Sequence, residues 1–169
     1  MAEGLLIQPP EIVEMDGPVI FIAGPIQGAP NWHTEAASMI HSQDSSIVVA
    51  SPRRDYPKGT FVYEKQVDWE THYLRRAAQL GVIAFWLAAQ AYDTPGRAYA
   101  QTSRVEIGEW MARCALDPQI KLTVGIEEGF GNARYISRRF GQECPQVRIV
   151  DDLGEMCKNA VDLAHGSVS

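Results

Sequence analysis

Five short apolar runs recur along the chain, each bounded by polar or turn-forming residues. The runs are largely continuous and do not alternate with polar positions. Continuous apolar runs of strand length are typical of strands buried on both faces, as in a parallel sheet. The predicted strands span residues 18–23, 46–51, 82–87, 122–126 and 147–150.

A segment with helical character follows each apolar run. The predicted helices span residues 31–43, 61–79, 102–115, 132–140 and 153–164. Asn31 is expected to cap the first helix, and Thr102 or Ser103 the third, because short polar side chains accept hydrogen bonds from the first backbone N–H groups. Alternating strands and helices imply right-handed crossovers. The sequence therefore predicts an α/β fold: a single doubly wound, flavodoxin-like sheet of five parallel strands in the order 2-1-3-4-5, with helices on both faces.

Residues 1–17 differ from the rest of the chain because they contain Pro9-Pro10 and several acidic residues. We interpret them as an extended N-terminal lead-in with room for a short edge strand. Residues 18–169 are predicted to form one α/β domain, a size that is ordinary for a single domain.

A ligand crevice is expected where the loops after the first and third predicted strands meet. In doubly wound sheets, ligands bind beyond the carboxyl ends of the strands at the point where the strand order reverses. The first loop contains Gly24, Pro25, Ile26, Gln27 and Gly28, and its two glycines allow backbone to approach a ligand closely. It is not a GxGxxG motif, so neither a dinucleotide site nor a P-loop is predicted. A tight turn without binding is the alternative interpretation.

Two acidic segments point to this crevice. Glu106 lies near the start of the third predicted helix, where the helix dipole favours an ionised carboxylate. Such a carboxylate is a candidate nucleophile or base, although an ordinary helix-start acid is the alternative. Asp68 and Glu70 lie two residues apart on the second helix, so only one of them can face a site. Glu109 is a further carboxylate that can work with Glu106 or lie in solvent.

Composition narrows the function classes. The net charge of -6 argues against binding to a nucleic-acid polymer, which needs a basic face. The three cysteines lack CxxC spacing, so a metal site is not expected, and we expect no cofactor. The sequence shows no signal peptide and no apolar run long enough for a membrane span, so a cytoplasmic location is expected. Four loop arginines can receive a phosphate or remain solvated: Arg53, Arg54, Arg97 and Arg104.

Four segments occur in the same order in a known family. These segments are residues 20–26, 67–70, 85–86 and 103–110. With them the chain resembles the nucleoside 2-deoxyribosyltransferase-like proteins, in their bacterial and phage branch, over roughly residues 18 to 130. The resemblance implies base exchange on 2′-deoxyribonucleosides through a covalent glycosyl-glutamate. It implies Glu106 as the nucleophile, a second acid at Glu70 or Asp68, with Glu70 favoured, and a small-molecule nucleoside or nucleotide and a free base as ligands.

The resemblance also implies substrate contacts. It places sugar and base contacts on the 24–28 loop, and Trp69 is a candidate contact whose alternative is a core position. Thr102, Ser103 and Arg104 can accommodate a 5′-phosphate, so a nucleoside 5′-monophosphate N-glycosidase is an alternative, as is a catalytically silent nucleotide-binding module. A homodimer or higher homo-oligomer is expected, because a neighbouring subunit completes the pocket in the resembling enzymes. The apolar helix residues predicted to be available for that contact are Trp110, Met111 and Tyr73.

Overall fold

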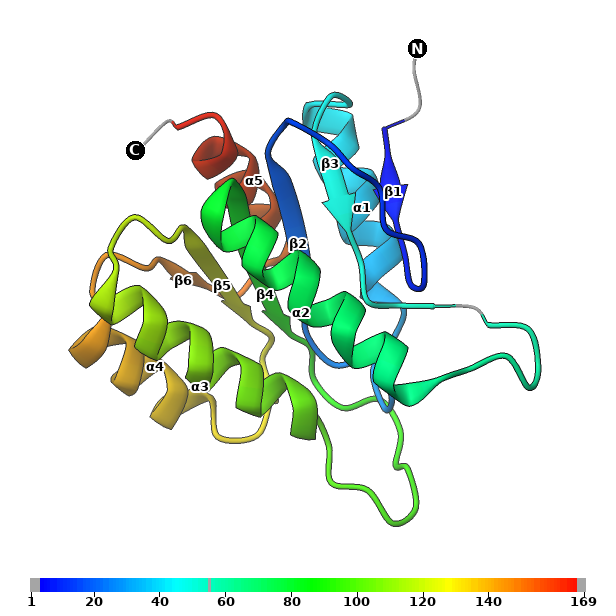
Figure 1. Ribbon diagram of the computed structural model, residues 1–169. Helices are drawn as coiled ribbons and strands as arrows, with labels where there is room; N and C mark the ends of the chain where they lie inside the picture. Colours follow the sequence, from blue (N-terminus) through cyan, green and yellow to red (C-terminus); the bar gives the residue numbers. More distant parts are fainter. Residues whose placement is uncertain (1–3, 55, 167–169) are drawn as a thin grey trace.

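The computed structural model describes residues 4–54 and 56–166, and Figure 1 shows their arrangement. In this part of the chain, six strands form one all-parallel sheet in the order β1-β3-β2-β4-β5-β6. The strands are β1 (Leu6–Ile7), β2 (Val19–Ala23), β3 (Val48–Ala50), β4 (Gly81–Leu87), β5 (Leu122–Ile126) and β6 (Ile149–Val150). The helices are α1 (Trp32–Gln43), α2 (Tyr63–Gln79), α3 (Gln101–Leu116), α4 (Ala133–Glu143) and α5 (Leu153–Ala164).

The strand count and strand order differ from the predicted five-stranded sheet. The additional strand, β1, lies in the N-terminal lead-in and pairs in parallel with β3, with Leu6 opposite Val49 and Ile7 opposite Ala50. Two residues are too short a segment to show a strand periodicity, so the sequence indicated only room for an edge strand. The predicted strand at 147–150 is also shorter in the structure, where β6 contains only its last two residues.

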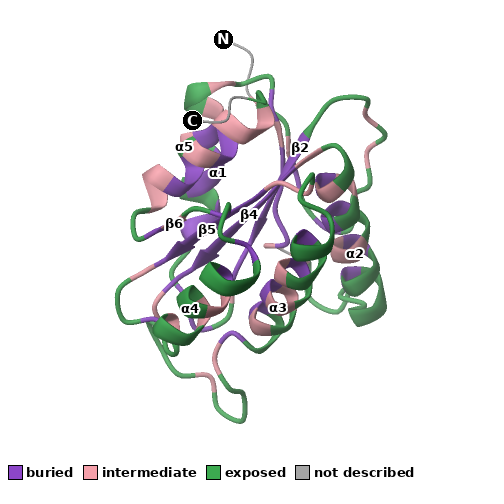
Figure 2. Cartoon of the chain, turned by 90° about the vertical axis from the view of Figure 1, so that its left-hand side faces the viewer, coloured by how far each residue is buried: buried purple, intermediate pink, exposed green. Residues whose placement is uncertain are grey.

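Helices cover both faces of the sheet, and each face has its own apolar core. Figure 2 shows the strands buried between the two helical layers. Helices α2, α3 and α4 pack on one face, which receives Phe21 and Phe85 from the central strands. Helices α1 and α5 pack on the other face, which receives Ile20 and Ala84. Successive strand residues therefore point to opposite cores, as the continuous apolar runs require.

The segment after β1 lies along helix α2 and is held there by side chains of that helix. The indole nitrogen of Trp69 donates to the Glu11 carbonyl at 2.6 Å. The Tyr73 hydroxyl accepts a hydrogen bond from the Val13 backbone N–H at 2.9 Å. Trp69 and Tyr73 are each only 1% exposed. Tyr73 and Trp110, which is 3% exposed, were predicted as subunit-contact residues, and that prediction is wrong for both because they lie in the core.

The first turns of α1 and α3 show different starts. Asn31 caps α1 as predicted, because its side chain accepts a hydrogen bond from the Thr34 N–H. The predicted cap of α3 by Thr102 or Ser103 is wrong. The helix follows Ala100, which adopts a left-handed conformation with φ of 58° and makes no side-chain cap. Both hydroxyl residues therefore lie in the first turn, and Glu106 lies in the second.

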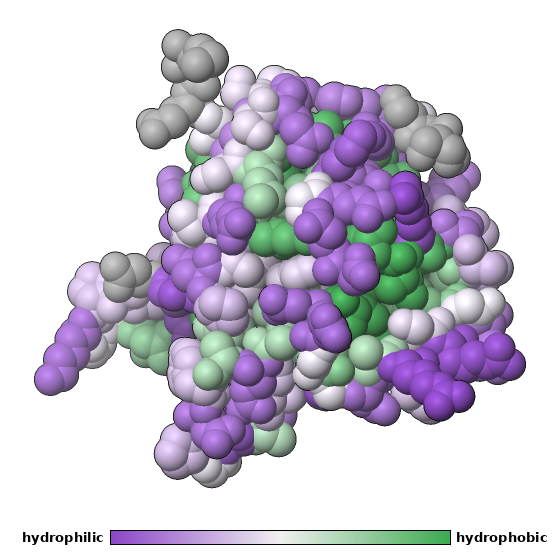
Figure 3. All heavy atoms as spheres, turned by 180° about the vertical axis from the view of Figure 1, so that it is seen from behind, coloured by the Kyte–Doolittle hydropathy of each residue, from purple (hydrophilic) through white to green (hydrophobic). Residues whose placement is uncertain are grey.

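The surface seen from behind is mostly polar, with an apolar area among the hydrophilic side chains (Figure 3). Among residues 4–54 and 56–166, no helix combines the length and apolar character that a membrane crossing would require.

Candidate functional site

A pocket of about 590 Å³ lies at the carboxyl ends of the central strands. Its walls come from the segments that follow β2, β3 and β4 and from helices α2 and α3. It therefore occupies the edge of the sheet where a doubly wound fold binds its ligand. Glu70 from α2 and Glu106 from α3 both line it. The pocket thus brings together two carboxylates that are 36 positions apart in the sequence (106 − 70).

The loop after β2 forms one wall, and close packing fixes its shape. Gly24 has φ of 152°, and a Cβ atom at this position would lie 2.1 Å from the Trp86 carbonyl oxygen. Only glycine fits such a contact. The residue after Gly24 is held in place as well, because the indole nitrogen of Trp32 donates a hydrogen bond to the Pro25 carbonyl at 2.9 Å. As predicted, Gly24, Pro25, Ile26 and Gln27 line the pocket.

Gly28, by contrast, does not reach the pocket lining. It has φ of 85°, and its carbonyl accepts hydrogen bonds from the backbone N–H groups of Ala91 at 2.7 Å and Tyr92 at 3.2 Å. A Cβ atom here would lie 2.9 Å from the Tyr99 ring. Gly28 therefore ties the loop after β2 to the loop after β4, which is a structural contact with the other wall of the site.

Glu106 is partly buried, and its surroundings disfavour its charged form. Burial, then the nearby charge of Glu70, then that of Glu109 raise its pKa to about 8. The expectation that the helix dipole keeps this carboxylate ionised is therefore wrong, because the pKa of Glu106 is raised. Glu106 lies in the second turn of α3, whereas the dipole acts mainly within the first, and desolvation and like charge outweigh it.

Glu70 lines the same pocket as Glu106 and has a neutral hydrogen-bond donor, Gln66, beside it. The Gln66 side-chain nitrogen donates to the Glu70 Oε1 at 2.6 Å and to the Pro52 carbonyl at 3.2 Å. Burial raises the pKa of Glu70, while the Gln66 hydrogen bond and the Arg54 charge oppose that rise. Two carboxylates that repel each other in a partly dry pocket cannot both ionise easily, so they titrate as a pair.

Arginine and aromatic side chains form the outer wall. The Arg54 guanidinium carbon lies 4.0 Å from the Phe61 ring centre and 5.4 Å from the Tyr56 ring centre. Arg54 and Arg97 both line the pocket, as was considered possible for loop arginines, whereas Arg53 does not. Cationic and aromatic groups at one mouth provide positive charge together with flat faces on which a planar ring can stack.

Thr102 and Ser103, in the first turn of α3, also line the pocket. Besides Gly28, three more predicted site residues lie outside the lining. Asp68 is exposed and lies with His72 and Arg75 on another side of α2. Trp69 is in the core, which was the alternative interpretation. Arg104 points toward the loop before α4: its Nη2 donates to the Gly131 carbonyl at 3.0 Å, and its guanidinium carbon lies 4.5 Å from the Phe130 ring centre.

Sequence reasoning missed several lining residues. Gln66 is one helical turn before Glu70, so the spacing to an already suspected carboxylate was a usable signal. Tyr56 lies in a loop without strand or helix periodicity. Phe61 and Tyr63 lie at the start of the predicted helix 61–79, where nothing in the sequence indicated that they face a pocket. The missed lining residues are Pro52, Tyr56, Phe61, Tyr63, Gln66, Val67, Ala100 and Gln101.

The described residues contain no group of three or more His, Cys, Asp and Glu side chains placed to hold a metal ion.

No protein-family model matches the chain, and no curated protein matches it significantly. The geometry of the site is therefore the structural evidence for its chemistry. A carboxylate pair that retains a proton at neutral pH can supply one nucleophile or base and one acid within the same pocket.

Proposed function

We propose that this protein transfers the 2′-deoxyribosyl group of a 2′-deoxyribonucleoside from one base to another, with Glu106 as the nucleophile. The observation that carries the proposal is the pairing of Glu106 and Glu70 in one pocket at the carboxyl ends of the strands. The sequence resemblance to nucleoside 2-deoxyribosyltransferase-like proteins selects this chemistry among the reactions open to a carboxylate pair.

The proposed reaction has two steps. In the first, a carboxylate oxygen of Glu106 forms a bond to the anomeric carbon while the bond from that carbon to the base breaks. The bonding electrons leave with the base, which takes a proton from Glu70 or from water. In the second, a nitrogen of a new base bonds to the anomeric carbon while the bond from that carbon to Glu106 breaks. The new base gives its N–H proton to Glu70 or to water, and Glu106 leaves as a carboxylate. The charge that develops on the sugar ring is positive, so an adjacent carboxylate stabilises the transition state.

The raised pKa of Glu106 sets a condition on this mechanism. With a pKa of about 8, Glu106 is mostly protonated at neutral pH, and a protonated carboxyl is a poor nucleophile. Glu106 must therefore lose this proton before or while its oxygen bonds to the anomeric carbon. The acid that the leaving base needs is then already present within the pair.

The experiment that tests the proposal is incubation of the protein with a panel of 2′-deoxyribonucleosides and free bases, followed by chromatography of the products. Exchange of bases between sugars is the expected result. A 2′-fluoro nucleoside analogue should also leave a glycosyl adduct on Glu106, detectable as added intact mass and located by peptide mapping. The proposal fails if neither exchange nor an adduct is found with any nucleoside; a catalytically silent nucleotide-binding module would then show only ligand-induced thermal stabilisation.

A second candidate function is the release of the base from nucleoside 5′-monophosphates by water. The observation that favours it is the presence of Arg54 and Arg97 in the pocket lining, where they can balance a phosphate. Free-base release from dCMP, dGMP or CMP without an acceptor base would support it. Nucleosides should then react more slowly than their monophosphates, and no release from any monophosphate would eliminate this candidate.

A further inference from the structure

Gln66 is a deeply buried polar side chain beside the carboxylate pair. It is 4% exposed, although it lies in the second turn of α2 next to exposed positions. Its carboxamide nitrogen lies between the Pro52 carbonyl oxygen at 3.2 Å and the Glu70 Oε1 at 2.6 Å. Burying an amide costs free energy unless its polar atoms find partners, so this placement needs an explanation beyond packing.

The contact with Pro52 fixes which way the carboxamide faces. A backbone carbonyl can only accept a hydrogen bond, so the Gln66 nitrogen and not its oxygen must face Pro52. The other N–H of the same nitrogen then points at Glu70, and the Glu70 Oε1 must act as an acceptor. The Gln66 oxygen is buried without a partner among the described residues, so this side chain is oriented by its donors alone.

We infer that Gln66 is a positioning residue that keeps Glu70 ionised before substrate binds and thereby leaves the proton of the carboxylate pair on Glu106. A hydrogen bond donated to a carboxylate stabilises its charged form. The 2.6 Å separation is slightly shorter than the usual range of charge-assisted bonds between nitrogen and oxygen, so the donor lies in close contact with the Glu70 oxygen. For its role in catalysis the inference rests on the proposed function, but the location of the proton does not.

The charges around the pair agree with this distribution. The Arg54 charge acts on Glu70 in the same direction as Gln66, while Glu109 acts on Glu106 in the opposite direction. Only Glu106 therefore combines burial with two neighbouring negative charges. The charged and titratable side chains that line the pocket besides the pair are Arg54, Tyr56, Tyr63 and Arg97.

This arrangement assigns Glu70 a defined part in the proposed reaction. Glu106 has to lose its proton before its oxygen can bond to the anomeric carbon. The ionised Glu70 is the base within the pocket that can accept this proton, directly or through water. Glu70 can then donate the same proton to the leaving base. One proton therefore moves from Glu106 to Glu70 and on to the base. At the end of this step Glu106 is esterified and Glu70 is ionised again.

The test is a titration of the glutamate side-chain carboxyl carbons by NMR in the substrate-free protein. In Gln66→Met, which removes the donor at similar volume, the pKa of Glu70 should rise and that of Glu106 should fall, each by about one pH unit. Gln79→Met is the matched control, because Gln79 is exposed on the same helix and lies outside the pocket lining. Unchanged pKa values in Gln66→Met, or equal shifts in the control, would overturn the inference.

A second variant keeps the inference testable if Gln66→Met does not fold. In Glu70→Gln the negative charge of Glu70 is absent, so the pKa of Glu106 should fall if Glu70 is charged in the native protein. A pKa of Glu106 that stays at its native value would show that Glu70 is already neutral, which contradicts the inference. Because the titration uses no substrate, a protein that titrates as expected but exchanges no bases would contradict the proposed function alone.

Discussion

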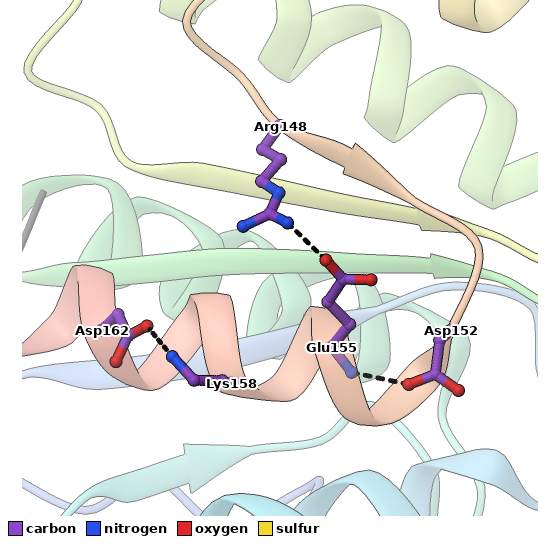
Figure 4. A network of polar contacts seen from close by, with 5 residues as sticks. All are labelled: Arg148, Asp152, Glu155, Lys158 and Asp162. Atoms are coloured by element: carbon purple, nitrogen blue, oxygen red, sulfur yellow. Dashed lines mark hydrogen bonds and ion pairs between the residues drawn. The ribbon is translucent and has the colours of Figure 1, made fainter. Parts of the chain in front are cut away.

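The carboxylates of helix α5 and those of the pocket have opposite surroundings. On α5, Glu155 pairs with Arg148, and Asp162 lies 2.6 Å from the Lys158 nitrogen (Figure 4). Asp152 accepts a hydrogen bond from the backbone N–H of Glu155 at 2.8 Å and so caps the helix. Each of these carboxylates has a partner and lies near the surface, where ionisation costs little.

The pocket carboxylates lack such partners. Among the residues that the structure describes, no ion pair involves Glu70 or Glu106. Both are partly buried, and both have raised pKa values. Such an arrangement lowers the free energy of unfolding at neutral pH, because ionising a partly buried carboxylate without an ion-pair partner is unfavourable. Paired surface carboxylates and unpaired pocket carboxylates therefore serve different ends, and strongly perturbed titration in a cleft is characteristic of functional sites.

The largest expected effect is on activity. Glu106→Gln keeps the size of the side chain but removes its nucleophilic oxygen, so base exchange should fall by at least ~10⁴-fold. Glu155→Gln removes a carboxylate of the same kind on α5 and should leave the exchange rate within about twofold of the native value. Initial rates of base exchange measure both.

Equal rates of base exchange in Glu106→Gln and Glu155→Gln would contradict the contrast between the pocket and the α5 carboxylates. Circular dichroism of Glu106→Gln should match the native protein, which excludes unfolding as the cause of lost activity. An active Glu106→Gln protein would show that another group attacks the sugar.

The next effect is on the pH dependence of stability. The folded pKa of Glu106 is about 8, against an ordinary value of 4.5. Between these values the folded chain holds a proton that the unfolded chain has lost. The contribution to the free energy of unfolding is therefore complete below about pH 4.5 and is lost as the pH rises to about 8, by up to about 1.4 kcal/mol per pH unit. Glu106→Gln cannot titrate and should lack this loss.

Urea unfolding between pH 6.5 and 8 measures the difference between the two proteins. This interval avoids His33, whose pKa is lowered from 6.5 to about 3, mainly by burial. That group has the opposite sign, because its contribution to stability is present above pH 6.5 and is lost as the pH falls to about 3. Parallel stability curves for the native protein and Glu106→Gln would contradict the raised pKa.

The sequence was sufficient for the parts of the fold that depend on long, regular patterns. Continuous apolar runs and the helices between them indicated a parallel α/β sheet covered on both faces, and this is confirmed. The edge strand β1 could not be assigned because Leu6 and Ile7 carry no periodicity. The start of α3 was misassigned because Ala100 adopts a left-handed conformation, which is unusual for alanine and is not indicated by the sequence.

The candidate site was predictable in two cases: where topology puts a loop at the ligand edge of the sheet, as for Gly24 to Gln27, and where a residue faces the pocket from a regular element. Helical spacing showed that Asp68 and Glu70 point to different sides, and the structure places Glu70 in the pocket and Asp68 outside it. Side chains whose direction depends on distant contacts could not be placed. Arg104 turns toward Phe130 and the Gly131 carbonyl, and nothing near it in the sequence indicates that contact.

A smaller effect is expected from the cap of α5. Asp152→Ala removes the acceptor for the Glu155 N–H and should lower the free energy of unfolding by about 1 kcal/mol. Asp151→Ala is the matched control, because Asp151 is the exposed neighbour that precedes the cap. Urea unfolding at pH 7 measures both variants, and base exchange should be unaffected in either. Equal destabilisation by the two substitutions would mean that net charge, and not capping, explains the loss.

The smallest effect is expected from an exposed ion pair of α5. The side chains of Lys158 and Asp162 are 65% and 32% exposed, so water and salt screen their attraction. Lys158→Ala should lower the free energy of unfolding by roughly 0.3–0.5 kcal/mol at low salt and by less at high salt. Urea unfolding at two ionic strengths measures this, with Lys158→Arg as the control that keeps the charge. A loss of several kcal/mol would show that the Lys158–Asp162 pair is a strong interaction despite its exposure. The contrast between weakly coupled surface carboxylates and strongly perturbed pocket carboxylates would then be wrong.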